Sequence, residues 1–183
     1  MVIPHNAKKV FNGILFDVYQ WKQKMFDNSI KTFEMLKRKS SATIIGIVDD
    51  KIIILNQEQP GRNRYYSLVG GCIEKGESPL DAAKRELLEE TGYTSSDFKL
   101  IYESFGWSKL YFHEYIFVAR NCKKISKPNF DSGEKGFIEI VSYDKFVEYL
   151  RKEDFIAPIK LKFKIYEDLL NKSQEFKEKI FSY

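Results

Sequence analysis

Three glutamates stand at helical spacing near the middle of the chain. Glu86, Glu89 and Glu90 follow one another at positions i, i+3 and i+4, so they share one face of a helix. Carboxylates gathered on one face repel each other unless a counter-charge lies beside them. Clustered carboxylate oxygens are the ligands that Mg²⁺ and Mn²⁺ prefer, and such cations bridge to substrate phosphates. The spacing therefore predicts a divalent-cation site for phosphate chemistry.

Two basic residues accompany the glutamates. Lys84 and Arg85 lie beside them, and Arg85 is also placed to reach Glu77 at the expected start of the helix. On composition alone, an ordinary charged surface helix would explain these residues. The spacing of the whole segment decides against that interpretation.

The predicted helix covers residues 79–91. Ser78 is a suitable N-cap, Pro79 suits the first turn, and Gly92 suits the C-terminal end. One side of this helix is apolar, with Leu80, Ala83, Leu87 and Leu88 at helical spacing. The glutamates must therefore be presented by a helix whose other side packs on a core.

The rest of the chain predicts a mixed α/β domain with helices packed on a sheet. Residues 10–38 indicate a hairpin around the polar turn 27–29, and the apolar runs 42–48 and 52–55 indicate a second hairpin that is buried on both faces. We expect a loop at 57–64, around Pro60-Gly61. Further strands are expected at 98–104, 110–119 and 137–141, and two helices after residue 142, divided near Pro158.

The segment 71–93 resembles the Nudix box, G-x5-E-x7-R-E-U-x-E-E-x-G-U, in which U is a bulky apolar residue. Seven fixed positions at roughly 7% each give a chance match at one start on the order of 10⁻⁸. Tyr93 at the final apolar position is the one departure, and it affects packing. The matching residues are Gly71, Glu77, Arg85, Glu86, Leu87, Glu89, Glu90 and Gly92.

The resemblance implies a Nudix-type α/β/α sandwich with a mixed sheet, and a pyrophosphohydrolase that uses Mg²⁺ or Mn²⁺. It implies that Glu86 and Glu90 are the principal metal ligands and that Glu89 supports a further ion. The backbone carbonyl of Gly70 would complete the coordination, as in the ADP-ribose branch. Glu77 and Arg85 would form the ion pair that fixes the loop against the helix.

Outside the box, the chain resembles the ADP-ribose and nucleoside diphosphate-sugar branch. The segments that carry this likeness are 10–38, 55–61, 115–121 and 133–135. It implies an N-terminal hairpin extension at 1–40, a Nudix domain at 41–183, and a homodimer in which the extension contacts the partner. Two departures concern the substrate: Ser104-Phe105-Gly106 replaces the usual Ser-Pro-Gly, and Gln59 stands where arginine is common.

Five more residues are candidates for the site. The resemblance implies Glu134 as the general base, with Glu89 as the next candidate, although a solvated loop carboxylate would look the same. Arg62 and Arg64 could bind phosphate or be solvated loop residues. Trp107 and Phe33 could stack on a base, although aromatic residues in strands more often pack a core.

Other substrates and another class of function stay open. The same fold could act on dinucleotide polyphosphates, modified nucleotides or capped RNA. A ligand-sensing module without turnover would show a loss of box glutamates or an attached DNA-binding domain, and the box glutamates are intact.

The bulk composition is that of a soluble globular protein. The net charge of +4 is mild and spread along the chain; it helps draw in phosphorylated substrates and does not by itself indicate nucleic acid. No apolar run has the length of a membrane span. Cys72 and Cys122 lack a metal-binding or disulfide spacing, so we expect a reduced, cytoplasmic setting.

Overall fold

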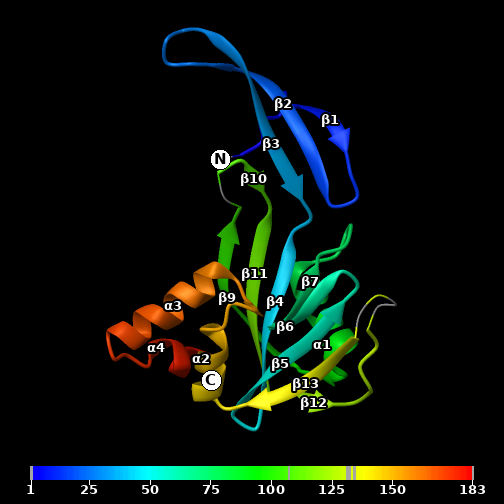
Figure 1. Ribbon diagram of the computed structural model, residues 1–183, viewed down its shortest axis with the longest axis vertical. Coiled ribbons are helices and arrows are strands. Elements are labelled where there is room, and N and C mark those ends of the chain that lie inside the picture. The colour runs from blue at the N-terminus through cyan, green and yellow to red at the C-terminus, as the bar shows by residue number, and fades with distance from the viewer. Residues whose placement is uncertain (1, 107, 131–132, 134, 183) are drawn as a thin grey trace.

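Two sheets lie one above the other along the length of the molecule (Figure 1). The computed structural model describes residues 2–106, 108–130, 133 and 135–182. The first sheet has the order β1-β2-β3-β10, with strands at Lys8–Asn12, Phe16–Lys24, Ile30–Arg38 and Leu110–Tyr111.

The second sheet carries the larger core. Its order is β14-β6-β5-β4-β11-β9, with strands at Phe155–Ile156, Arg62–Ser67, Lys51–Gln59, Ser41–Val48, His113–Arg120 and Asp97–Phe105. Two more strands join it, β13 (Lys135–Val141) beside β5 and β7 (Val69–Cys72) beside β4. A small separate pair consists of β8 (Tyr93–Thr94) and β12 (Lys123–Lys124).

The two sheets are joined by strands that continue from one to the other. β3 ends at Arg38 and β4 begins at Ser41, while β10 ends at Tyr111 and β11 begins at His113. Both β10 against β3 and β11 against β4 are parallel pairs. The chain therefore passes twice between the sheets through very short connections.

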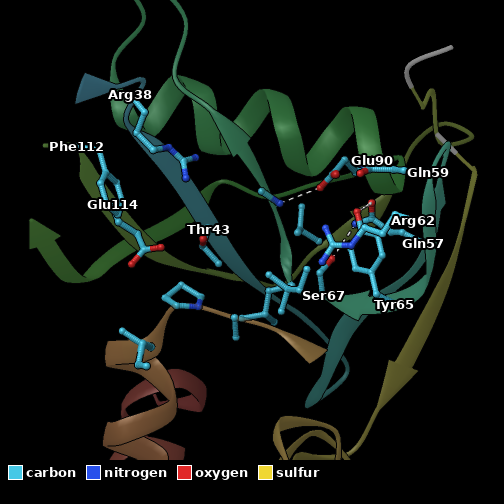
Figure 2. A pocket seen from close by; sticks show the side chains of 17 residues that line it. Arg38, Thr43, Gln57, Gln59, Arg62, Tyr65, Ser67, Glu90, Phe112 and Glu114 are labelled. Carbon is cyan, nitrogen blue, oxygen red and sulfur yellow. Dashed lines mark hydrogen bonds between the residues drawn. The ribbon is translucent and has the colours of Figure 1, made fainter. Parts of the chain in front are cut away.

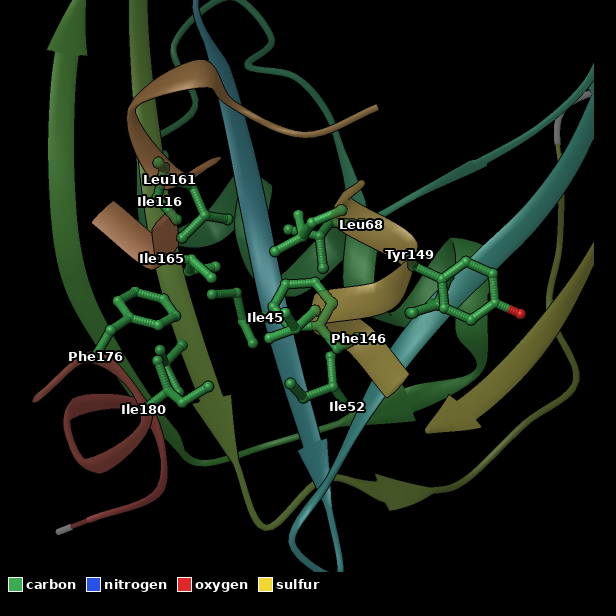
Figure 3. Packing of buried hydrophobic residues seen from close by; sticks show 14 of the residues in the cluster. Ile45, Ile52, Leu68, Ile116, Phe146, Tyr149, Leu161, Ile165, Phe176 and Ile180 are labelled. Atoms are coloured by element: carbon green, nitrogen blue, oxygen red, sulfur yellow. The ribbon is translucent and has the colours of Figure 1, made fainter. Parts of the chain in front are cut away.

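Helices cover both faces of the second sheet. On one face α1 (Pro79–Thr91) packs through Ala82, Ala83 and Leu87 on strand residues such as Ile44 and Phe117. On the other face lie α2 (Tyr143–Leu150), α3 (Ile159–Leu170) and α4 (Glu175–Phe181). Figure 3 shows residues of the core under these three helices. This is the α/β/α sandwich with a mixed sheet that the sequence predicts.

The central strands belong to both cores. Ile44 packs toward α1 and Ile45 toward the other helices, and Ile53 and Ile54 divide in the same way. Successive side chains of a strand point to opposite faces, so a strand covered on both faces reads as a continuous apolar run. The predicted burial of the second hairpin on both faces is confirmed.

The elements differ from the prediction at four places. The segment 57–64 is a continuous hairpin of β5 and β6 around Pro60-Gly61, because Gly61 takes a φ of 76° and allows a tight turn. Strand β1 was not predicted, because all its residues are exposed and show no alternation. The tail holds α4 as a third helix. The predicted strand 110–119 is divided at Phe112 into β10 and β11.

The predicted hairpin in 10–38 is present as β2 and β3, paired from Phe16–Arg38 to Lys24–Ile30. The division at residue 40 and the homodimer stay predictions. Among the described residues, no helix is both long and apolar enough to cross a membrane.

Phe146 is a sensitive point of the core under α2. Its side chain has 0% exposure and lies among Ile45, Ile52 and Leu68 (Figure 3). Phe146→Ala should lower the free energy of unfolding by about 3–5 kcal/mol, because it leaves a large cavity. Urea denaturation measures this loss. Phe163→Ala on α3 removes the same ring from a position that is 64% exposed, and an equal loss there would contradict the assignment of the core.

Candidate active site

Helix α1 begins and ends at strong local signals. The Ser78 side chain accepts a hydrogen bond from the backbone N–H of Asp81 at 3.1 Å, and Pro79 opens the first turn. Gly92 ends the helix with a φ of 72°, the left-handed conformation that glycine adopts at C-caps. These signals fix which residues of α1 face the neighbouring strand β7.

The Arg85 guanidinium joins the loop before α1 to the helix itself. Its Nε and one terminal nitrogen donate to the two carboxylate oxygens of Glu77 at 2.9 and 3.1 Å. The same nitrogen donates to the carbonyl of Cys72 at 3.0 Å. The other nitrogen donates to Glu86 at 2.8 Å and Glu89 at 3.0 Å. The ion pair predicted between Glu77 and Arg85 is therefore present in bidentate form.

The charges in this cluster shift the pKa values in opposite directions. Hydrogen bonds from Arg85 lower the pKa of Glu77, with a further contribution from the Glu74 backbone N–H. The bond to Glu77 raises the pKa of Arg85. Burial raises the pKa of Glu86 although Arg85 donates to it, since that side chain is only 12% exposed.

Two successive glycines of β7 allow close packing on its two neighbours, Gly70 on β4 and Gly71 on α1. At Gly70 the φ is 152°, and a Cβ would lie 2.3 Å from the carbonyl oxygen of Ala42. At Gly71 a Cβ would lie 2.3 Å from Oε1 of Glu86. The backbone N–H of Gly70 donates to Glu90 at 2.8 Å. The carboxylates of Glu86 and Glu90 thus rest against a strand surface without side chains.

The donor set at this end of α1 fits a hard cation. Its polar groups are carboxylate oxygens: Arg85 pairs with Glu77, Glu86 and Glu89, and Glu90 lies beside them on Gly70, so negative charge is in excess. Gly71 forms a cradle for Glu86 that any larger residue would fill. Within the described ranges no three acidic, histidine or cysteine side chains converge on one point. In this arrangement Arg85 donates to Glu86 and Glu89, and Glu90 accepts from Gly70.

A cavity of about 550 Å³ opens beside this cluster (Figure 2). Gly70 and Glu90 are the two residues of the cluster among its lining. Figure 2 shows Gln57, Arg62 and Tyr65 at one end of the cavity. Strand β7, through Gly70, and the last turn of α1, through Glu90, therefore form part of the wall of a cavity that can receive a small molecule.

A protein-family model identifies the family to which this geometry belongs. The family model described as the NUDIX domain matches residues 37–163, and this range includes the loop, α1 and every residue that lines the cavity. The chain belongs to the Nudix family.

Similar proteins support the membership. ADP-ribose pyrophosphatase of Bacillus subtilis (strain 168) is 27% identical over 139 residues, covering 73% of this chain and 74% of that protein. ADP compounds hydrolase NudE of Escherichia coli (strain K12) is 30% identical over 95 residues, 50% of this chain and 51% of NudE. A crystal structure of an ADP compounds hydrolase has a TM-score of 0.73 at 22% identity, covering 92% and 94% of the two chains. This last likeness shows a shared Nudix fold.

Of the described residues predicted to bind substrate, Arg62 lines the cavity, whereas Arg64 and Phe33 do not. Arg62 lines the cavity, with its guanidinium 3.9 Å from the centroid of the Tyr65 ring. Arg64 instead extends to Glu58, at 3.5 Å, and Phe33 packs on Trp21 in the first sheet. Their positions give no support to a role at this cavity. Glu134 and Trp107 lie outside the described residues.

Several lining residues were not singled out from the sequence, and three of them stand together. Arg38, Phe112 and Glu114 stand at the end of the cavity opposite to Arg62 (Figure 2). They come from the last residue of β3, the break between β10 and β11, and the start of β11. No local spacing links such residues, and it is the parallel pairing of β3 with β10 and of β4 with β11 that places their segments together.

The cradle at Gly71 generates a test of the Nudix box geometry. Gly71→Ala should displace the Glu86 carboxylate, because the new methyl group would occupy its position. We expect turnover to fall by about 10-fold or more, given the sensitivity of catalysis to small misplacements, with the melting temperature recording how far the fold is kept.

Cys72→Ala is the matched control on the same strand. It removes a side chain but keeps the backbone carbonyl that accepts from Arg85, so activity should be preserved. Equal activity of the two variants would show that the position of Glu86 does not matter.

Proposed function

We propose that this Nudix protein hydrolyses the diphosphate linkage of ADP-ribose or a related nucleoside diphosphate sugar, with Mg²⁺ or Mn²⁺ as cofactor. The observation that carries the proposal is the carboxylate face of α1, which reaches the wall of a cavity through Glu90 and Gly70. The similar proteins from Bacillus subtilis and Escherichia coli are named for the same substrate class.

In this proposal Glu86 and Glu90 hold the cation, Glu89 supports a further ion, and the carbonyl of Gly70 completes the set. A bound Mg²⁺ supplies polarisation of the diphosphate and lowers the pKa of a nearby water. Arg85 and Glu77 act as positioning residues, since their bidentate pair fixes the loop before α1. Their contribution is to keep the carboxylates on one face in register with β7.

Arg62 is the residue that we propose to contact substrate at its end of the cavity. Its exposed guanidinium is held against Tyr65 and carries positive charge toward the space in front of Glu90. A cation in a cavity draws phosphates and offsets their charge. Glu134 is proposed as the general base that takes the proton of the attacking water, with Glu89 as the next candidate.

The first test is a panel of substrates with purified protein and Mg²⁺. ADP-ribose, UDP-glucose, diadenosine polyphosphates and triphosphate-ended RNA are compared by phosphatase-coupled release of phosphate. We expect the sugar conjugates to give the highest kcat/KM, and EDTA to abolish turnover. Preference for RNA or for a dinucleotide would replace the proposed substrate class, and binding without any turnover would indicate a sensing module.

The same assay tests the metal ligands. Glu90→Gln should reduce turnover by several orders of magnitude, because a ligand oxygen loses its charge. Glu77→Gln keeps the loop's shape and should cost less, since Glu77 acts through Arg85. Undiminished turnover in Glu90→Gln, with the fold intact, would remove Glu90 from the cation site.

A separate variant tests the base. Glu134→Gln should lower kcat by about 10²–10⁴-fold, while KM changes little because the side chain acts on water. Glu58→Gln is the control. Glu58 lies opposite Lys135, the chain neighbour of residue 134, in the register of β5 and β13, and its side chain is 52% exposed. A normal kcat in Glu134→Gln would transfer the role to Glu89.

A further inference from the structure

Arg62 faces the cavity although its place in strand β6 should point it away. Successive side chains of a strand point to opposite faces, so a regular strand would turn residue 62 to the face opposite to Tyr65. Arg64 follows this rule, since it extends to Glu58 and does not line the cavity. Arg62 nevertheless lines the cavity together with Tyr65. A local irregularity of the hairpin must therefore turn its side chain inward.

The pairing of β5 with β6 contains that irregularity. Gln57 lies opposite Tyr65, and Gln59 lies opposite Arg62. One residue separates the two partners on β5, whereas two residues separate those on β6, so β6 carries one extra residue as a β-bulge. The extra residue reverses the alternation beyond it, which places Arg62 on the same face as Tyr65. Figure 2 shows both side chains at the same end of the cavity.

The ring of Tyr65 supports the guanidinium that the bulge turns inward. Cζ of Arg62 lies 3.9 Å from the centroid of this ring, whereas the corresponding distance from Arg64 to Phe137 is 5.4 Å. A guanidinium that stacks on an aromatic face keeps its N–H donors in its own plane. Two such donors match two oxygens of one phosphate. Stacking on Tyr65 therefore leaves the edge of Arg62 that can bind phosphate directed to the cavity.

A chain of buried polar groups fixes the ring. The Tyr65 hydroxyl donates to Oε1 of Gln57 at 3.3 Å, and Nε2 of Gln57 donates to Oγ of Ser67 at 2.8 Å. All three residues are buried. Breaking a buried hydrogen bond leaves a polar group without compensation, so the ring is costly to turn away. The chain thus connects the backbone of both strands of the hairpin to the surface on which Arg62 rests.

We propose that Tyr65 is a positioning residue that, together with the bulge of β6, aims the Arg62 guanidinium to bind a substrate phosphate through two donors. The inference rests on the proposed function for the assignment of Arg62 to the substrate. Tyr65 acts through Arg62, and Gln57 and Ser67 act through Tyr65. Loss of the ring should therefore weaken phosphate binding only while Arg62 is present.

A double-mutant cycle tests this dependence by calorimetric binding in EDTA. The probes are ADP-ribose and inorganic pyrophosphate, which carries the phosphates without nucleoside or sugar. The proteins are wild type, Tyr65→Leu, Tyr65→Phe, Arg62→Gln and the double variant Tyr65→Leu/Arg62→Gln. Arg64→Gln is the matched control, because it removes an arginine of the same strand that pairs with Glu58 and does not line the cavity. The melting temperature of each variant records how far the fold is kept.

We expect Arg62→Gln to weaken the binding of both probes about 10–100-fold, as for the loss of a hydrogen bond to a charged group. Tyr65→Leu should weaken it about 3–10-fold, since the cation loses its aromatic surface. Tyr65→Phe should restore most of that loss, because the ring is kept. In the Arg62→Gln background, Tyr65→Leu should cause no further weakening, and Arg64→Gln should bind as wild type does.

Other outcomes overturn the positioning role. They are equal weakening by Tyr65→Leu in both backgrounds, which a purely structural role would give, binding by Tyr65→Phe as weak as by Tyr65→Leu, unchanged binding by Arg62→Gln, or no binding of either probe by wild type. Turnover of ADP-ribose with Mg²⁺ is scored in a separate assay. Coupling of the two residues without turnover would keep the positioning role and refute the hydrolase, while turnover without coupling would do the reverse.

Discussion

The guanidinium of Arg85 connects the three segments that form the acidic cluster: the loop before α1, strand β7 and helix α1. Arg85 uses its fork of donors on Glu77, on the backbone of β7 at Cys72, and on two glutamates of its own helix. The loop before α1, the strand and the helix are therefore fixed relative to one another by one side chain. Lysine, a point charge without a planar fork, could not make these bonds together.

The close contact of α1 with β7 depends on that arrangement. Because Gly71 has no side chain, the Glu86 carboxylate lies directly against the strand, and the Glu90 carboxylate accepts from the backbone N–H of Gly70. The rest of α1 faces inward through Ala82, Ala83 and Leu87. One side of α1 thus packs on the core and stabilises the fold, while another side presents the acidic residues beside β7.

Much of this arrangement could be predicted because it is local. The ends of α1, the Glu77–Arg85 pair and the burial of 42–48 all follow from spacing within one segment. The opposite end of the cavity could not be predicted in that way, because Arg38 and Glu114 are brought together by strand pairing over a long stretch of chain. Strand pairing also decides the position of Phe33, which was predicted to stack on a base. The register of β2 and β3 places it opposite Trp21, on which it packs.

The continuity of β3 into β4 bears on how far the two sheets are separable. Arg38 is the last residue of β3, and only two residues lie between it and β4. The first sheet is therefore joined to the cavity wall by a two-residue link, and Arg38 belongs to both. The family match begins at residue 37 and includes Arg38. A shortened chain that started at β4 would keep every acidic residue of α1 and yet lose one wall of the space they face.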